Sequence, residues 1–289
     1  MSDIDRPGWR FDAIGTRWRI DTAEPLADGV RADVAEVIDR FDREWSRFRP
    51  DSLVSGLALS GGDVPAPSDA QAMLDAYVSL AEATGGAVNP LVGETLARRG
   101  YDAAYSFTDR GARPAPADWR DIVRWSAGRL SLDEPAILDV GALGKGRLVD
   151  LILDRVRPAA GPWAVVDGGG DIAVAGTTQR IALEHPYDAT RAIGTWTVTD
   201  AALCASATNR RVWGEGLHHV LDARTGEPVR QYAATWAVAP DTMTADAVAT
   251  ALFFDGGPQL AAQWNASWVR MRTDGSVEWS PECEAELFL

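Results

Sequence analysis

The chain has 289 residues and an ordinary globular composition, with 46% hydrophobic and 24% charged residues. This composition excludes a disordered or fibrous chain, and the length suits one large α/β body or a body with a smaller lobe. The 42 acidic residues outnumber the 28 basic ones and give a formal net charge of -14. Because nucleic acid and anionic membranes both require a basic footprint, we expect no nucleic acid and no membrane surface among the partners.

The first residues are acidic and polar, whereas a signal peptide needs a basic start and an apolar core. No apolar run approaches the roughly 18 residues that a membrane helix requires. The two cysteines, Cys204 and Cys283, are too few for a disulfide framework and are expected to be buried free thiols. We therefore expect a cytoplasmic protein without membrane insertion.

In chain order, the apolar spacing first predicts one strand and three helices. The strand covers residues 9–20. The three helices cover residues 26–48, a segment that starts at Ser68 or Asp69 and stops at Gly85, and residues 92–99. A polar, proline-rich stretch at residues 110–116 is the best candidate for a linker. Beyond it, strands are predicted over 122–125, 129–132, 137–140, 163–166, 171–175, 179–183, 196–199, 202–205, 219–221 and 232–239, and helices over 147–156, 242–254 and 258–264.

This order of elements predicts a mixed α/β fold of the α+β type. We expect a single domain over residues 1–289, with a helix-rich lobe over about 1–110 and a sheet-rich lobe over about 117–289.

Lysine occurs once in the chain, at Lys145, while the other 27 basic residues are arginine. Lys145 lies in a glycine-rich turn at residues 141–146, which accepts a thin lysine stem more readily than a broad guanidinium. We interpret Lys145 as an anion-binding residue, the alternative being that a single lysine survives by chance. The turn is not a P-loop, because Asp139 stands where that motif has its first glycine and Gly146 where it has Ser or Thr.

Residues 168–173 fit the pattern G-x-G-x-x-A of dinucleotide-binding proteins. That pattern must open a helix, because the helix N-terminus holds the pyrophosphate. Residues 171–176 are strand-like and short, so we predict a tight turn between two strands instead.

Two further groups of polar residues can carry chemistry. Asp246 and Thr250 are four residues apart on a predicted helix, which places a carboxylate and a hydroxyl on one face. Such hard oxygen ligands suit Mg²⁺, although Asp246 could instead only favour the helix dipole. His218 and His219 point to opposite sides of the predicted strand, so at most one of them is expected to face a given site.

Several segments, in this order, resemble the ApbE family, the FAD:protein FMN transferases. Residues 139–146 resemble the family's D-L-G-G-I-A-K-G, 166–172 its N-x-G-G-D-I, 219–226 its H-I-I-D-P-R-T-G, and 245–252 its A-D-A-L-A-T-A-L. Residues 14–16 resemble M-G-T, 46–52 resemble S-x-Y-x-P-x-S, and 84–87 resemble T-G-G-A. The resemblance spans nearly the whole chain and implies an ApbE-like, T-fold-like body that is rich in sheet, with a mainly helical N-terminal part.

The resemblance implies Mg²⁺-dependent transfer of FMN from the substrate FAD to a Thr or Ser hydroxyl of an acceptor protein, with release of AMP. It implies metal ligands at Asp246, Thr250 and the backbone carbonyl of Gly144. It implies FAD contacts at Lys145, Asp171, Gly169, Gly170, Ser206, His219 and Asp246, and catalytic roles for His219, Asp222 and Lys145. The residue types agree, because attack on a pyrophosphate needs positioning, a metal and a fixed cation. His219 is the candidate base, since an imidazole can be neutral at pH 7.

Two alternatives of other classes stay open. Water could replace the acceptor hydroxyl, which would make the protein an FAD pyrophosphatase that yields FMN and AMP. Residues 205–210 depart from the family's T-S-G-D-Y-E, which would also allow a binding protein that holds FAD without turnover.

Overall fold

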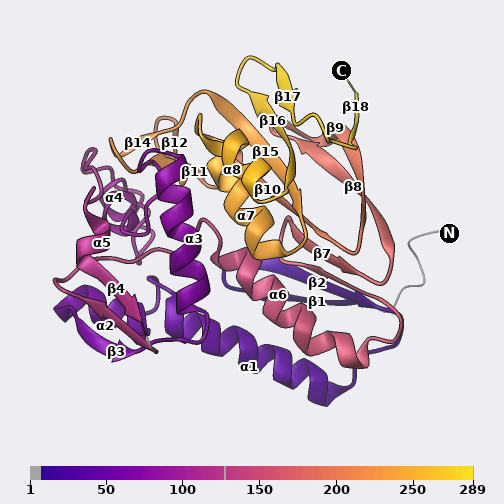
Figure 1. The fold of residues 1–289 in the computed structure, drawn as a ribbon, viewed down its shortest axis with the longest axis horizontal. Coiled ribbons are helices and arrows are strands. Elements are labelled where there is room, and N and C mark those ends of the chain that lie inside the picture. The colour runs from indigo at the N-terminus through magenta and orange to yellow at the C-terminus, as the bar shows by residue number, and fades with distance from the viewer. Residues whose placement is uncertain (1–7, 127, 289) are drawn as a thin grey trace.

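The computed structural model describes residues 8–126 and 128–288 and contains a large eight-stranded sheet (Figure 1). Its strands lie in the order β1-β2-β6-β7-β10-β15-β16-β17, and all neighbours are antiparallel. They span β1 Gly8–Ala13, β2 Thr16–Thr22, β6 Ala164–Asp167, β7 Asp171–Ala175, β10 Ala202–Ala207, β15 Tyr232–Ala239, β16 Ser267–Arg272 and β17 Val277–Trp279. Segments far apart in the sequence therefore share one sheet, and the predicted mixed helix-and-sheet class is confirmed.

One face of this sheet packs against two helices, α6 (Gly144–Val156) and α7 (Thr242–Ala251). Side chains alternate along a strand, so Cys204 and Ala237 point to this face and join the core beneath α7. Most residues of β15 are buried, as befits a strand that is covered on both faces.

The opposite face packs against a second, three-stranded sheet. Leu203 and Trp236, the neighbours of Cys204 and Ala237, belong to this second core. The smaller sheet consists of β8 (Thr178–His185), β9 (Asp188–Thr199) and β18 (Glu286–Leu287) in the order β18-β9-β8.

The N-terminal part adds helices and a small sheet beside the main body (Figure 1). Its elements are α1 (Asp28–Trp45), α2 (Leu53–Ser60), β3 (Gly62–Pro65), α3 (Ala70–Ala83), α4 (Gly93–Arg98), α5 (Trp119–Ile122), β4 (Val123–Ser126) and β5 (Arg129–Leu132). In α1, Val34, Ile38, Phe41 and Trp45 are buried at helical spacing, as the sequence predicts. Strands β3, β5 and β4 pair in that order.

Short elements complete the chain between the large strands and after them. They are the 3₁₀ turns Arg157–Ala159 and Thr208–Arg210, the paired strands β11 (Val212–Trp213) and β12 (Leu217–His218), the pair β13 (Leu221–Asp222) and β14 (Glu227–Pro228), and α8 (Gly257–Gln263). Cys204 is buried and Cys283 is half-buried, and both are free thiols.

The stretch 9–20, predicted as one strand, is instead a hairpin. Ile14 and Gly15 connect β1 to β2 with φ angles of 43° and 73°. Two positive φ angles in a two-residue loop are typical of a type I′ turn, whose twist suits an antiparallel hairpin. The alternation of apolar and polar residues runs through the turn, so periodicity alone does not reveal it.

Other boundaries were predicted with mixed success. Strands 129–132, 171–175 and 232–239 are confirmed to the residue, and residues 168–170 form the predicted tight turn between strands. The predicted strand 137–140 is irregular, because its backbone leads into the turn that starts α6. Of the predicted strand 219–221, residues 219 and 220 connect β12 to β13, and only Leu221 is in a strand. The helix α2 was not predicted, and α6 begins three residues earlier than expected, at Gly144.

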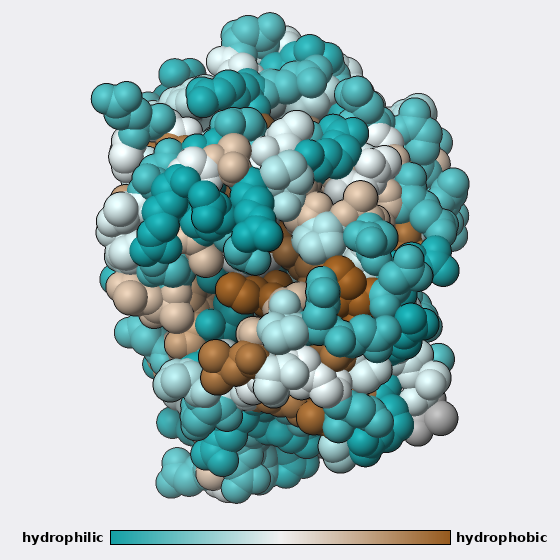
Figure 2. All heavy atoms as spheres, turned by 90° about the vertical axis from the view of Figure 1, so that its left-hand side faces the viewer, coloured by the Kyte–Doolittle hydropathy of each residue, from teal (hydrophilic) through white to brown (hydrophobic). Residues whose placement is uncertain are grey.

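One face of the protein surface can be described by its hydropathy. The face that lies on the left of Figure 1 is mostly hydrophilic, with hydrophobic atoms gathered across its middle (Figure 2). Within the described residues, no helix has both the length and the apolar character that a bilayer span requires.

Candidate functional site

Lys145 lies in the first turn of α6, at the point where this helix meets α7. Gly144 begins α6, and a Cβ atom on Gly146 would lie 2.3 Å from the carbonyl oxygen of Thr242 and 2.7 Å from Cβ of Asp246. Both distances are far below van der Waals contact, so glycine at position 146 lets the two helices touch. The glycine-rich turn therefore brings a helix N-terminus and Lys145 against α7.

The Lys145 ammonium forms an ion pair with Asp171, the first residue of β7. Nζ of Lys145 lies 2.7 Å from Oδ2 of Asp171 and 3.5 Å from the carbonyl oxygen of Gly169. Asp171 is fully buried, and burial raises its pKa although Lys145 acts to lower it. Burial acts to lower the pKa of Lys145, but the charges of Asp171 and Asp246 raise it overall, so the ammonium stays charged.

Asp246 is a second buried carboxylate beside this pair. Its Oδ2 accepts a hydrogen bond of 2.9 Å from the backbone N–H of Gly146. Burial raises the pKa of Asp246 well above its usual value, and the charge of Asp171 raises it further. When all three side chains are ionised, Lys145, Asp171 and Asp246 carry a net charge of -1, so an additional cation would be stabilised here.

Thr250 lies one helical turn after Asp246 and faces the same turn of backbone. Its hydroxyl donates a hydrogen bond of 3.2 Å to the carbonyl oxygen of Ala142. Thr250 therefore contacts the carbonyl of Ala142 and not that of Gly144. Gly144 is the first residue of α6, and its carbonyl is directed along the helix. Asp246, Thr250 and the Ala142 carbonyl offer oxygen atoms alone, which fits a hard divalent cation such as Mg²⁺. Within the described part of the chain, no three His, Cys, Asp or Glu side chains gather in a metal-binding group.

The turn between β6 and β7 forms the other side of Lys145. Asp167 accepts hydrogen bonds from the N–H groups of Gly169, at 2.8 Å, and Gly170, at 3.0 Å. Both glycines have positive φ angles, 77° and 103°. A Cβ on Gly169 would lie 2.2 Å from the Thr16 hydroxyl, so the β1–β2 turn packs directly against this backbone.

Ser206 lies on β10, next to the same turn. The N–H of Ala205 donates a 3.0 Å hydrogen bond to the carbonyl of Gly170, and Cys204 pairs with Asp171 in the sheet. Because side chains alternate, Ser206 points to the same face as Cys204 and Asp171, the face that α6 and α7 cover. Gly169 thus contacts Lys145 through its carbonyl, Gly170 bonds to β10, and Ser206 lies two residues beyond the partner of Asp171 on that strand.

His219 is half-buried in the bend after β12. Burial, and secondarily the positive charge of Arg211, lower its pKa to about 3, so the imidazole is neutral at pH 7. Its Nδ1 is buried and has no hydrogen-bond partner among the described residues. His219 is therefore a neutral polar group that is available to a ligand.

His218, the last residue of β12, has a different environment from His219 in the bend that follows. Its Nε2 donates a 2.9 Å hydrogen bond to the carbonyl of Val229, and its Nδ1 accepts one of 3.3 Å from the N–H of Val220. Burial lowers the pKa of His218, which agrees with a neutral ring whose two nitrogens are both used. His218 is thus a structural residue.

Asp222 is the last residue of β13 and the first residue of the turn that leads to β14. Its carboxylate forms an ion pair of 2.6 Å with Arg224 and accepts the N–H of Arg224 at 2.9 Å. The guanidinium of Arg224 lies over the Gly85–Gly86 backbone, since a Cβ on Gly85 would be 3.6 Å from its nitrogen. Asp222 therefore joins the loop that carries His219 to residues 84–87, and its ion pair with Arg224 is separate from the contacts of Lys145 and Asp246.

Arg47, which follows α1, and Tyr77 in α3 contact the lysine turn, residues 139–146. Neither residue was predicted to belong to the site. Nε of Arg47 lies 2.5 Å from the Asp139 carboxylate, which also accepts the Gly141 N–H at 2.7 Å. The Tyr77 hydroxyl donates to the Asp139 carbonyl at 3.0 Å and accepts the Ala142 N–H at 3.3 Å. Both residues thereby fix the carbonyl that faces Thr250. Arg47 could have been found from the sequence, because it lies in the segment 46–52 that resembles an ApbE motif.

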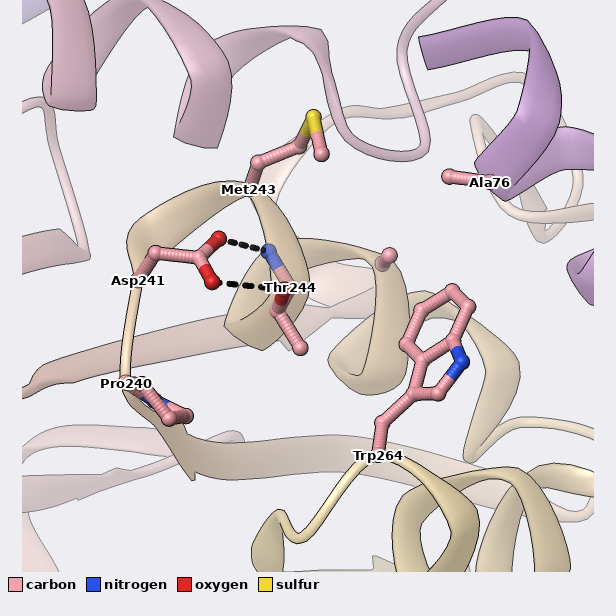
Figure 3. Close-up of a pocket in the computed structure, with 7 residues that line it drawn as sticks. Ala76, Pro240, Asp241, Met243, Thr244 and Trp264 are labelled. Carbon is pink, nitrogen blue, oxygen red and sulfur yellow. Dashed lines mark hydrogen bonds between the residues drawn. The ribbon is translucent and has the colours of Figure 1, made fainter. Parts of the chain in front are cut away.

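A pocket of about 280 Å³ lies on another face of α7 (Figure 3). Ala76, Pro240, Asp241, Met243, Thr244, Ala247 and Trp264 line it. In Figure 3 the Asp241 carboxylate binds the N–H and the hydroxyl of Thr244, both at 2.8 Å. Asp246 and Thr250 do not line this pocket, so it is distinct from the lysine–carboxylate cluster.

Solved structures of other proteins share the fold of this chain. The ApbE protein of Thermotoga maritima superposes with a TM-score of 0.80 at 21% identity, covering 96% of this chain and 97% of that one. The flavin transferase ApbE of Vibrio cholerae superposes with a TM-score of 0.76 at 21% identity, over 96% and 98% of the two chains. The fold is therefore that of the ApbE proteins.

Comparison of the sequence with family profiles and with known proteins identifies the family of this chain. The profile of the ApbE family matches residues 14–270, so the chain belongs to the ApbE family, as its motifs predicted. An FAD:protein FMN transferase of Rhodobacter capsulatus is 26% identical, and the match covers 96% of this chain but 57% of that protein. One of Treponema pallidum, with the same name, is 29% identical over 84% of this chain and 77% of its own length. The chain thus spans little more than half of the first relative.

Proposed function

We propose that this protein transfers FMN from FAD to a Ser or Thr hydroxyl of an acceptor protein. A new bond forms between the acceptor oxygen and the phosphorus on the FMN side, the pyrophosphate P–O bond breaks, and AMP leaves with the electron pair. The observation that carries the proposal is the half-buried Lys145, which is ion-paired with Asp171 and feels the charge of Asp246, near the oxygen donors of Thr250 and Ala142. Membership of the ApbE family, whose named relatives are FAD:protein FMN transferases, supports the same reaction.

A divalent cation fits the reaction and the residues. Asp246, Thr250 and the Ala142 carbonyl would hold Mg²⁺, and the second carboxylate beside the single ammonium would favour the cation when Asp246 is ionised. When bound, Mg²⁺ supplies charge neutralisation at the pyrophosphate oxygens.

Lys145 supplies the fixed positive charge. Its ammonium is held by Asp171 and stays protonated, because the surrounding carboxylates raise its pKa. A cation that is already in place needs no reorganisation as negative charge develops on the leaving phosphate. We assign to Gly169, Gly170 and Ser206 the contacts with FAD on this side of the site, because the Gly169 carbonyl contacts the ammonium, and Gly170 and Ser206 belong to the adjoining turn and strand.

His219 is the proton acceptor that we assign to the acceptor hydroxyl. Its ring is neutral and its buried Nδ1 is unpaired among the described residues. A pKa of about 3 is low for a general base, but the negative charge of a bound pyrophosphate would raise it toward the working pH. Asp222, whose carboxylate binds Arg224, then shapes the loop on which His219 lies.

The test is in-gel flavin fluorescence with purified protein, FAD, Mg²⁺ and a candidate acceptor domain, with AMP measured in the same tube. Transfer predicts a fluorescent acceptor band that a chelator abolishes, and one AMP for each flavin attached. AMP without the band indicates hydrolysis of FAD by water, and FAD binding without either product indicates a binding protein. Lys145→Ala and Asp246→Ala should each abolish the band while circular dichroism shows an intact fold.

A further inference from the structure

Helices α6 and α7 each bind the N-terminus of the other through a carboxylate. Asp246 on α7 accepts the N–H of Gly146, in the first turn of α6, at 2.9 Å. Asp150 on α6 accepts the N–H of Thr242 at 2.8 Å and that of Met243 at 2.9 Å, which are the first two residues of α7. These N–H groups have no partner within their own helices, so the two carboxylates satisfy backbone donors that would otherwise be unpaired.

Asp150 is not needed for α7 to have an N-cap. The helix has a local cap in Asp241, whose carboxylate accepts both the N–H and the hydroxyl of Thr244 at 2.8 Å. Asp241 and Thr244 belong to the same helix end, so this bond stabilises α7 wherever the helix lies. The bonds of Asp150 cross between helices and depend on how α7 is placed against α6.

The placement of α7 sets the geometry of the candidate site. Asp246 is one turn along α7 from Thr242, and Thr250 is one turn further, whereas Lys145 and Ala142 belong to α6 and the turn before it. The helices touch where glycine at position 146 leaves no room for a Cβ. A shift of α7 along α6 would therefore move the Asp246 carboxylate and the Thr250 hydroxyl relative to Lys145 and the Ala142 carbonyl.

We propose that Asp150 is a positioning residue, which locks α7 onto α6 and thereby holds Asp246 and Thr250 in register with the lysine turn. This inference rests on the proposed function for its catalytic consequence. Its structural consequence is a preformed oxygen site, which can be measured without any turnover.

The experiment compares Asp150→Ala, Asp150→Asn and the control Asp241→Ala in the full chain. Asp150→Ala removes both cross-helix bonds, and Asp150→Asn keeps the size but can accept only one N–H bond, because its amide nitrogen is a donor. Asp241→Ala removes a cap from the same helix end without touching α6. Binding of Mn²⁺, followed by the electron paramagnetic resonance of the free ion, probes the oxygen donors directly. Melting temperature and kcat for FMN transfer are measured on the same samples.

We expect Asp150→Ala to weaken Mn²⁺ binding and to lower kcat by about 10- to 100-fold, which is the usual effect of losing a group that orients metal ligands. Asp150→Asn should lie between this variant and the wild type, while Asp241→Ala should lower the melting temperature and leave Mn²⁺ affinity unchanged. The inference is wrong if Asp150→Ala binds Mn²⁺ like the wild type, or loses no more affinity than Asp241→Ala does. If Asp150→Ala does not fold, Asp150→Asn decides in the same way. A wild type that binds Mn²⁺ without transferring FMN refutes the proposed function alone, and a wild type that does not bind Mn²⁺ refutes the role of Asp150.

Discussion

Gly146→Ala adds a single methyl group at the contact between α6 and α7, and its effect can be worked out from the structure. The new Cβ would lie 2.3 Å from the Thr242 carbonyl oxygen and 2.7 Å from Cβ of Asp246, whereas ordinary contacts begin at 3.4 Å. Because Thr242 O belongs to the backbone, no side chain can turn away. The helices must therefore separate by about 1 Å, the difference between 2.3 and 3.4 Å.

This separation has a cost in stability and in activity. Overpacking a tight contact destabilises a protein by about 1–3 kcal/mol. A displacement of about 1 Å between reacting groups can reduce turnover by roughly 100-fold. We expect losses of these sizes in the free energy of unfolding, from urea titration, and in kcat for FMN transfer.

Gly56→Ala is the matched control. Gly56 is an exposed residue inside α2, and a Cβ there meets no atom within 4 Å. Alanine should stabilise this helix by up to about 1 kcal/mol and leave turnover unchanged. If Gly146→Ala were as stable and as active as Gly56→Ala, the close contact between α6 and α7 would not exist as described.

Three further substitutions test individual side chains. Lys145→Arg should lower kcat by at least about tenfold despite the retained charge, because a planar guanidinium does not reproduce the compact ammonium beside Asp171; kcat at the wild-type level would show that charge alone suffices. Thr250→Val should raise the Mg²⁺ concentration for half-maximal transfer about 10-fold or more without unfolding the protein, since a methyl group of similar size replaces an oxygen donor. An unchanged Mg²⁺ titration would show that Thr250 is not a metal ligand. The pKa of His219 is 6.5 in the unfolded chain and about 3 in the folded protein. Between these pH values the unfolded state binds more protons than the folded state. The contribution of His219 to stability is therefore lost as the pH falls from 6.5 toward 3. Between pH 7 and pH 5 the wild type should lose about 2 kcal/mol more than His219→Gln in urea unfolding, and equal losses would mean that His219 is not buried as a neutral ring.

Local patterns in the sequence predicted those parts of the site that lie on one element. The i, i+4 spacing of Asp246 and Thr250 placed them on one helix face, and both meet the lysine turn through Gly146 and Ala142. His218 and His219 do have different surroundings, but His218 ends β12 and His219 lies in the bend after it, so strand alternation is not the cause. The strand-like character of residues 171–175 distinguished the turn 168–170 from a dinucleotide-binding loop.

Contacts between distant segments carry no local signal. The Arg47–Asp139 bond joins residues 92 positions apart, and the Asp150–Thr242 bond also spans 92 positions. The resemblance to the ApbE family placed Lys145 and Asp171 at one FAD site, but their ion pair was not predicted, because it requires α6 to lie across β7. In α2, a short apolar run with a central glycine lacks helical periodicity, and burial of Val54 and Leu57 against the rest of the core fixes the helix instead.

Transfer of FMN can be followed directly by the intact mass of an acceptor domain after incubation with this protein, FAD and Mg²⁺. We expect an increase equal to one FMN less one water, located on a Ser or Thr residue, that requires the divalent cation and disappears in Lys145→Ala. An unchanged acceptor mass while FAD is converted to FMN and AMP would contradict transfer, and so would a full mass increase with Lys145→Ala.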